Sequence, residues 1–364
     1  MNRKRGYLQN TRLNALRDLL VEKKLSNILL TDSIDVRYLC GFCSSSVSVL
    51  ISRKKNYLLT DFRYQEAACK FCARNPVWTF ILVKKSLQES LKKLISSGAT
   101  VGFQGNELTV DRFSELKKTL KGVVFKSVSQ EIARIFEVKL RQEIEVMRQA
   151  AEIGDTALKW FLERLEPGMT EIEAASMLEL FCSEGGSQRT SFETIVLFGA
   201  RSALPHGRPS AKKLARGDYV LVDFGCVVDG YCSDMTRTVV MGKASTRQRE
   251  IYAVVKSAQA RAVESARAGM RSVDLDKIAR DIIAGAGYRE EFGHALGHGV
   301  GLRVHERPRV SPHVNEFLQE NTVVTIEPGI YVPGFGGVRI EDMVVLHKNG
   351  NDVLTTFSHE LIEL

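Results

Sequence analysis

Two patterns of apolar and polar residues divide the chain. Up to about Phe136, stretches with apolar residues at helical spacing alternate with short apolar runs. The helical spacing is found in LNALRDLLVEKKL and FSELKKTLKG, and the apolar runs include NILLT, VSVLI, YLLT and ATVGF. This alternation predicts a compact α/β domain with a partly parallel sheet over residues 1–136.

Residues 137–364 begin with a long helix pattern and then mix strands with helices. KLRQEIEVMRQAAEIGDTALKWFLERL places its apolar residues on one stripe, and Pro167 with Gly168 ends it. Thr170 opens a capping box for the next helix. Strands are expected around Val196, Val220, Val239, Val323, Ile340 and Leu354. We predict an α+β domain here, so that a chain of 364 residues forms two domains.

Composition indicates a globular protein. Hydrophobic residues make up 44% of the chain and charged residues 26%, and no apolar run reaches the roughly 18 residues of a membrane span. The basic start continues as an amphipathic helix without a signal-peptide core, so we expect a cytoplasmic protein. A net charge of +8 without a basic stripe interleaved with aromatics favours a solvated surface. We therefore expect no nucleic-acid partner and no membrane partner.

The seven cysteines include two C-x-x-C pairs, CGFC from Cys40 to Cys43 and CKFC from Cys69 to Cys72. Four thiolates in such pairs can bind zinc. The second pair lies in a helix-like stretch, where Cys69 and Cys72 are expected to be small buried side chains. Reduced thiols are therefore the preferred interpretation, and a zinc site is the alternative.

Candidate chemistry begins at YVLVDFGCVVDGYCSDMTRTVVM. Two apolar strands flank Asp229 and Gly230, which predict a two-residue hairpin turn. In that register Asp223 lies opposite Thr236 and Asp234 is its diagonal neighbour, with Cβ atoms roughly 7 to 8 Å apart. Two such carboxylates can converge on cations that lie between them. The alternative is that Asp223 satisfies backbone groups or an arginine such as Arg237.

Two more acids and three histidines add to this group. Glu327 follows the apolar run TVVTI, and Glu341 alternates with apolar residues in VRIEDMVVL. His294, His298 and His305 lie in GHALGHGVGLRVHE, where the first two have the spacing of a zinc helix. The glycines around them cost a helix roughly 1 kcal/mol each, which favours a loop or an irregular strand. Four acids with one imidazole suit two divalent ions of the manganese or cobalt type.

From about Lys139 to its end, the sequence resembles the catalytic domain of the pita-bread metallopeptidases, the family of methionine aminopeptidase, prolidase and aminopeptidase P. The family's ligands follow the order Asp, Asp, His, Glu, Glu. They are matched here by VDFG (Asp223), SDMTRT (Asp234), GHGVG (His298), IEPGIY (Glu327) and VRIED (Glu341). The resemblance implies a pita-bread catalytic domain over residues 137–364, preceded by a smaller creatinase-like α/β domain over residues 1–136.

The DGYCSDMTRT segment, Arg339 and the extra N-terminal domain resemble aminopeptidase P and prolidase more than methionine aminopeptidase. This subclass implies an Xaa-Pro aminopeptidase, which releases the residue before a proline in second position; the alternative is an Xaa-Pro dipeptidase. It also implies two divalent ions, most often Mn with Co or Zn as options, bridged by Asp234 and Glu341 and activating a shared hydroxide. A homodimer is expected, because dimers are common among relatives.

The resemblance also implies roles for single residues. Glu327 would be both a ligand and the proton shuttle, and the alternative is that it acts only as a ligand. His206, in ALPHGRPS, and His305 would contact the substrate and the tetrahedral intermediate. Arg339 would orient a carboxylate ligand or bind substrate. His294 would be a pocket wall or substrate contact, and a purely structural role is its alternative.

Two functions from other classes compete with a peptidase. One is a non-catalytic pita-bread module that binds protein or nucleic acid, and the other is a metal-free relative such as creatinase. The five retained ligand residues argue against both.

Overall fold

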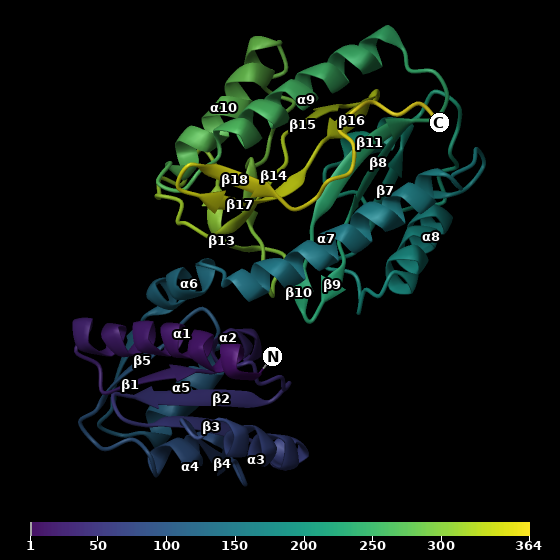
Figure 1. The fold of residues 1–364 in the computed structure, drawn as a ribbon. Coiled ribbons are helices and arrows are strands. Elements are labelled where there is room, and N and C mark those ends of the chain that lie inside the picture. Colours follow the sequence, from purple (N-terminus) through teal and green to yellow (C-terminus); the bar gives the residue numbers. More distant parts are fainter. Residues whose placement is uncertain (1) are drawn as a thin grey trace. The chain divides into compact units, whose positions relative to one another are not determined.

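The computed structural model describes residues 2–364, with side chains from residue 11 onward. It divides after Phe136 into two compact units (Figure 1). None of the helices in the described residues is long and apolar enough to cross a membrane.

The N-terminal unit contains a six-stranded sheet in the order β4-β3-β2-β1-β5-β6. Only β2 is antiparallel to its neighbours; the other described strands of this sheet run parallel. The strands are β1 (Asn27–Leu30), β2 (Val47–Ser52), β3 (Asn56–Thr60), β4 (Trp78–Leu82), β5 (Thr100–Phe103) and β6 (Val124–Ser127). The helices are α1 (Asn2–Glu22), α2 (Ser33–Cys40), the 3-10 helix η1 (Phe62–Tyr64), α3 (Gln65–Arg74), α4 (Leu87–Lys92), α5 (Val110–Thr119) and α6 (Ser129–Glu137). The partly parallel sheet that the sequence predicts is confirmed.

The cysteines of this unit differ from the expectation. Cys69 is exposed and Cys72 is half-buried, so the prediction that both are buried is wrong. The reason is that α3 buries only Ala68 completely, and Cys69, the next residue, faces away from it. Among the described residues, the one group of His, Cys, Asp or Glu side chains close enough to hold a metal ion contains no cysteine.

The second unit, residues 137–364, has helices on the outside of several small sheets (Figure 1). Its helices are α7 (Arg141–Leu162), α8 (Glu171–Glu184), the 3-10 helix η2 (Gly199–Ala203), α9 (Thr246–Ser265) and α10 (Ser272–Gly285). Its strands are β7 (Ile195–Phe198), β8 (Tyr219–Phe224), β9 (Val227–Val228), β10 (Tyr231–Cys232), β11 (Met235–Val240), β12 (Gly297–Gly299), β13 (Glu306–Val310), β14 (Val323–Ile326), β15 (Gly329–Val332), β16 (Gly336–Arg339), β17 (Asp342–His347) and β18 (Gly350–Val353).

Two sheets of this unit carry the candidate site. One has the order β11-β8-β7, and the other has the order β13-β12-β14-β17-β18. Apolar residues of α7 and α8 pack with the first sheet, and those of α9 and α10 pack with β14 and β17 of the second. The outer faces of the sheets are thus used for the core, which leaves other strand positions for polar side chains.

The hairpin register expected at Asp223 is confirmed. Asp223 pairs with Thr236 across β8 and β11, and Tyr231 pairs with Val228 across β10 and β9. Asp229 and Gly230 have φ angles of 41° and 74°, as a two-residue turn with two left-handed positions requires.

Candidate active site

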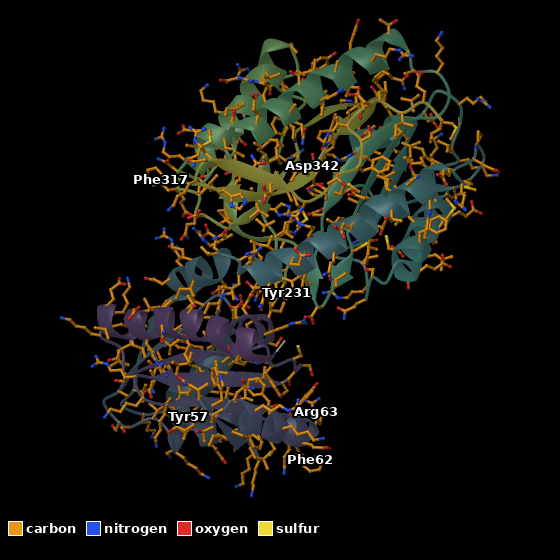
Figure 2. All side chains as sticks on the ribbon, viewed as in Figure 1. Tyr57, Phe62, Arg63, Tyr231, Phe317 and Asp342 are labelled. Atoms are coloured by element: carbon orange, nitrogen blue, oxygen red, sulfur yellow. The ribbon has the colours of Figure 1, made fainter. Side chains whose placement is uncertain are left out.

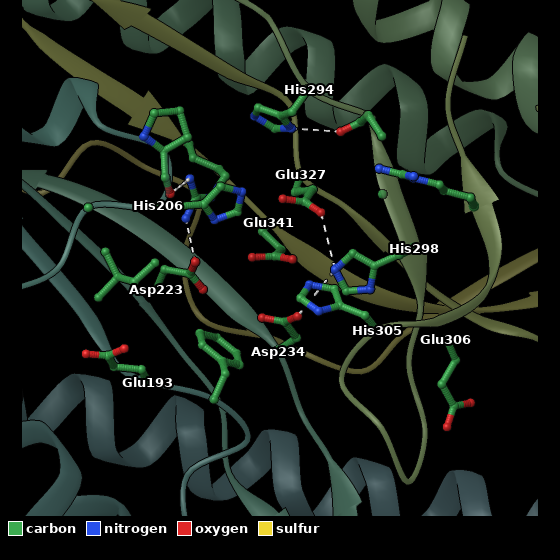
Figure 3. A pocket seen from close by; sticks show the side chains of 18 of the residues that line it. Glu193, His206, Asp223, Asp234, His294, His298, His305, Glu306, Glu327 and Glu341 are labelled. Atoms are coloured by element: carbon green, nitrogen blue, oxygen red, sulfur yellow. Dashed lines mark hydrogen bonds and ion pairs between the residues drawn. The ribbon is translucent and has the colours of Figure 1, made fainter. Parts of the chain in front are cut away.

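A cavity of about 900 Å³ contains every side chain that the sequence singled out for the site. Asp223 lies in β8, Asp234 just before β11, His298 in β12, and Glu327 just after β14. Glu341 lies between β16 and β17. The lining includes Asp223, Asp234, His298, Glu327, Glu341, His206, His294, His305 and Arg339. Figure 3 shows these acids and histidines facing a common space.

The expected ligands come close together at the centre of this cavity. Ligand atoms of Asp234, His298 and Glu341 all lie within 4.8 Å of one another. His298 Nε2 lies 3.4 Å from Glu327 Oε1 and 3.7 Å from Asp234 Oδ2 (Figure 3). His298 Nδ1 contacts the backbone oxygen of Gly299 at 3.1 Å, which leaves Nε2 facing the carboxylates.

Without a bound cation, the charged forms of these buried carboxylates are unfavourable. Burial, followed by repulsion from the neighbouring carboxylates, raises the pKa of Asp234 and of Glu341 well above the usual range. Burial raises the pKa of Glu327 to about 8 and lowers the pKa of His298 to about 4. The imidazole is thus neutral near pH 7, as a metal ligand must be.

The donor set fits divalent cations. Four carboxylates, those of Asp223, Asp234, Glu327 and Glu341, line the cavity beside the buried guanidinium of Arg339. One oxygen of Asp223 binds Arg339, and the other, Oδ1, is buried without a hydrogen-bond partner. An unsatisfied buried oxygen among clustered carboxylates and a neutral imidazole is what oxygen-preferring divalent ions would satisfy.

Arg339 connects the ligand residues to residues that the sequence did not single out. Its Nη2 donates to Asp223 at 2.5 Å, its Nε donates to Thr236 Oγ1 at 2.9 Å, and its Nη1 donates to Tyr331 Oη at 2.8 Å. Thr236 in turn donates to Glu341 Oε2 at 2.6 Å. The predicted hairpin places Thr236 opposite Asp223 but gives no sign of its role, and Tyr331 carries only the weak signal of an aromatic following IEPGI.

Asp342 is next to Glu341 in the chain but makes a separate set of contacts. It is fully buried and accepts hydrogen bonds from Arg237 Nη2 at 2.7 Å and Thr355 Oγ1 at 2.8 Å. His359 Nε2 lies 2.6 Å from its other oxygen. Arg237 also donates to the backbone oxygen of Glu341 at 2.6 Å. Arg237 therefore binds Asp342 rather than Asp223, the partner that the sequence offers as an alternative.

The three other cavity histidines differ in exposure. His206 and His305 are exposed, and the ring of His305 lies 4.3 Å from that of His298. His294 is half-buried, and its Nε2 lies 2.9 Å from Tyr331 Oη. His294 is thus linked through Tyr331 to Arg339.

The cavity also contains four arginines, and three of them have partners. Arg339 binds Asp223, Arg307 pairs with Glu316, and Arg208 pairs with Glu193. Arg309, in β13 opposite His298, is exposed, and its side chain makes no hydrogen bond or ion pair with another described residue. No sequence signal marks Arg309, because it is one of many surface arginines until the strand pairing is known.

Comparisons with known proteins identify the family of both units. Residues 145–348 match metallopeptidase family M24, and residues 12–136 match the creatinase/prolidase N-terminal domain. The chain is 36% identical to an Xaa-Pro dipeptidase of Pyrococcus furiosus, over 96% of this chain and 99% of the relative.

Solved structures are similar over nearly the whole length. An Xaa-Pro dipeptidase from Bacillus anthracis superposes with a TM-score of 0.93 at 36% identity, covering 98% of this chain and 100% of that one. An X-Pro aminopeptidase from Thermotoga maritima gives a TM-score of 0.87 at 34% identity, covering 97% and 99%. The predicted pita-bread catalytic domain with a smaller α/β domain before it is confirmed. This chain belongs to metallopeptidase family M24, with a creatinase/prolidase domain at its N-terminal side.

Proposed function

We propose that this chain is a divalent-metal-dependent Xaa-Pro dipeptidase, which hydrolyses the bond before proline in a dipeptide. Family membership and the carboxylate-rich cavity support metallopeptidase chemistry. Relatives named Xaa-Pro dipeptidase, at 36% identity, support this alternative better than the aminopeptidase expected first.

The guanidinium of Arg309 in the cavity is the observation that favours a dipeptidase over an aminopeptidase. A dipeptide differs from a longer peptide because its proline has a free carboxylate. Arg309 offers an unpaired guanidinium in the cavity beside His298 and His305. A guanidinium binds a carboxylate through two parallel hydrogen bonds, and a substrate that continues beyond proline has no carboxylate at that place.

The aminopeptidase remains the second candidate. It is supported by the similarity to the X-Pro aminopeptidase from Thermotoga maritima, which is nearly as extensive as the similarity to dipeptidases. The two activities cleave the same bond and differ in whether the substrate ends at proline or continues beyond it. Substrate length is therefore the property that separates them.

In this proposal, Asp223, Asp234, His298, Glu327 and Glu341 hold two divalent ions, for which Mn is our first choice and Co or Zn are alternatives. Bound ions supply Lewis acidity that polarises the scissile carbonyl and lowers the pKa of water. Glu327 Oε accepts a proton from the attacking water and passes it to the leaving proline nitrogen. His206 and His305 donate hydrogen bonds to the substrate and the tetrahedral intermediate.

The remaining assignments rest on the contacts. Arg339, with its donors used by Asp223, Thr236 and Tyr331, orients ligands rather than binding substrate directly. His294 supports Tyr331 from the pocket wall. A homodimer and a cytoplasmic location complete the proposal; the free thiols, including exposed Cys43 and Cys69, suit a reducing compartment.

The test compares Ala-Pro, Ala-Pro-amide and Ala-Pro-Ala with the Mn-loaded enzyme. We expect kcat/KM to be highest for Ala-Pro by at least about tenfold, because a hydrogen-bonded charge pair contributes on the order of 10- to 100-fold. Arg309→Gln should raise KM for Ala-Pro by a similar factor and leave Ala-Pro-Ala nearly unchanged. A wild-type preference for the tripeptide would show an aminopeptidase instead.

A further inference from the structure

The charge of this chain is divided unequally between its two units. Residues 1–136 contain 24 Lys and Arg against 11 Asp and Glu, a net charge of +13. Residues 137–364 contain 27 against 32, a net charge of −5. The chain average of +8 therefore hides a strongly basic N-terminal unit.

The topology of this unit brings basic segments to one end of its sheet. The amino ends of the parallel strands lie at one end of the sheet. The antiparallel strand β2 finishes at this same end, where the hairpin at 53–55 leads into β3. Ser26 N donates to Thr100 O, Gly98 N donates to Gly122 O, and Asn56 Nδ2 donates to Val77 O. These bonds hold the segments side by side. We call this end the amino edge; it consists of residues 21–26, 52–56, 74–78, 92–100 and 117–124.

Figure 2 labels residues at the two ends of strand β3. Tyr57, at the start of β3, and Phe62 and Arg63, beyond its end, are labelled on opposite sides of the sheet. The amino edge is the side of Tyr57. Ten exposed basic side chains project from it: Lys24, Arg53, Lys54, Lys55, Arg74, Lys92, Lys93, Lys117, Lys118 and Lys121.

Almost nothing neutralises these cations. The only acidic residue in the amino edge is Glu22, which pairs with Lys23 at 3.5 Å. None of the ten cations forms an ion pair with another residue that the structure describes; Lys117 lies over the ring of Phe113 at 5.8 Å. The edge is therefore a patch of one sign of charge.

Helix ends explain part of this pattern. α1, α3, α4 and α5 all end at the amino edge, and a cation near a helix C-terminus is stabilised by the helix dipole. That effect does not apply to Arg53, Lys54 and Lys55, which lie on a hairpin. Helix C-termini also present carbonyls instead of the N–H groups that bind a single phosphate. The positive potential is thus spread over long side chains and does not form a cradle for one anion.

The composition of the edge favours a lipid surface over nucleic acid. Eight of the ten cations are lysines, whereas nucleic-acid sites favour arginine and exposed stacking aromatics. Trp78, at this edge, is buried. Val21, Val77 and Val124 are 59%, 43% and 53% exposed beside the lysines. Lysines with small exposed apolar groups are typical of proteins that bind anionic membranes peripherally.

We propose that the amino edge of the N-terminal sheet docks this protein reversibly on an anionic phospholipid surface. The basic side chains meet the headgroups, and Val21, Val77 and Val124 reach the interfacial layer. This departs from the expectation of no membrane partner, which rests on the absence of an apolar run long enough to span a membrane. The inference is independent of the peptidase activity.

The experiment is co-sedimentation of the full-length metal-loaded protein with vesicles. We expect binding to equal parts of phosphatidylglycerol and phosphatidylcholine, weak binding to phosphatidylcholine alone, and a decrease with added NaCl. Replacing the hairpin cations together, Arg53→Glu with Lys54→Glu and Lys55→Glu, should lower partitioning at least about 100-fold, because each cation contributes about fivefold. Lys92→Glu with Lys93→Glu is an independent second variant on α4.

The matched control carries the same change of net charge elsewhere. Lys159→Glu with Lys243→Glu and Arg289→Glu alters three exposed cations of the catalytic unit and should retain partitioning within about threefold, since distant charges are screened. Thermal unfolding confirms that each variant is folded. Equal losses in hairpin variant and control, or equal binding to neutral vesicles, would overturn the proposal. Binding to polyuridylate but not to anionic vesicles would also overturn it, in favour of a nucleic-acid surface.

Discussion

At the scale of single residues, the expected ligands are held by neighbours that fix their direction. Arg339 holds Asp223, Thr236 holds Glu341, and Thr325 donates to Glu327 at 3.2 Å. Such support is what lets buried carboxylates converge on ions instead of turning apart. Asp234 has the least support: its backbone N–H contacts Met343 Sδ, and the nearest cationic or imidazole nitrogen to its carboxylate is His298 Nε2 at 3.7 Å.

We therefore expect Asp234→Asn to lose both metal and activity. The amide keeps the size of the side chain but removes the charge shared with the cations. The measurements are metal content per chain after dialysis and hydrolysis of Ala-Pro, before and after chelation and reloading with Mn. Cys232→Ser, close in sequence but outside the cavity lining, is the control that should retain both. Activity that survives chelation in the wild type would contradict the metal-dependent mechanism.

The lowered pKa of His294 predicts part of the decrease in folding stability below neutral pH. Burial, followed by the charge of Arg339, lowers its pKa from 6.5 to about 4. In the unfolded chain the imidazole gains a proton as the pH falls through about 6.5, while the folded chain does not. The contribution of His294 to stability is therefore complete above pH 6.5 and is lost between pH 6.5 and 4.

Replacing His294 removes this loss. We expect His294→Gln, which can still contact Tyr331, to have a free energy of unfolding that falls less steeply than the wild type between pH 6.5 and 4. Urea titrations at several pH values measure it. Parallel pH profiles for the two proteins would show that the folded imidazole is not kept neutral.

At the scale of elements, β12 shows why the strand that carries His298 is rich in glycine. A Cβ at Gly297 would lie 2.0 Å from Thr325 O, and a Cβ at Gly299 would lie 2.1 Å from Arg307 O. The strand is enclosed by backbone on both sides, from β14 and from β13. Glycine is required here by close approach and not by an unusual turn.

Gly297→Ala should therefore displace His298 and lower kcat/KM about 100-fold, because a shift of about 1 Å at a site has that effect. The added methyl group cannot be accommodated without moving Thr325 or β12. Gly293→Ala is the matched control on the same segment, since a Cβ there meets nothing within 4 Å. Equal activity of the two variants would show that β12 adjusts freely.

Some of these elements can be predicted from the sequence and others cannot. Asp229 and Gly230 predict the hairpin, and the period of two along its strands then gives the register of Asp223. The glycines around His298 exclude a helix but do not predict a strand, because the pairing partners lie far along the chain. The contacts of Thr236 and Tyr331 with Arg339, and the place of Arg309 in the cavity, could not be predicted, since they depend on pairing between distant strands.

At the scale of the whole molecule, the two units have separate hydrophobic cores. The boundary near residue 136 follows from the change in apolar pattern, which is a local property of the sequence. The uneven charge is also countable in the sequence, but its concentration at one edge depends on strand order and helix direction. The net charge of the whole chain therefore does not reveal the basic surface of the N-terminal unit.

Separate cores predict separate responses to metal. We expect calorimetry to resolve two unfolding transitions and Mn²⁺ in excess to raise one of them by about 5 to 10 °C, since saturation at 100 times Kd adds about 2.7 kcal/mol. The other transition, that of the N-terminal unit, should not move. One transition, or an equal shift of both, would show that the units unfold together.

The neighbouring acids Glu341 and Asp342 have a consequence for how this chain can diverge. One faces the cavity and the other is enclosed by Arg237, Thr355 and His359. A one-residue insertion or deletion beside this pair would shift its register by one position, so that one carboxylate would take the place of the other and the second would leave both environments. We therefore expect changes in chain length to be tolerated less well beside this pair than in the exposed loops.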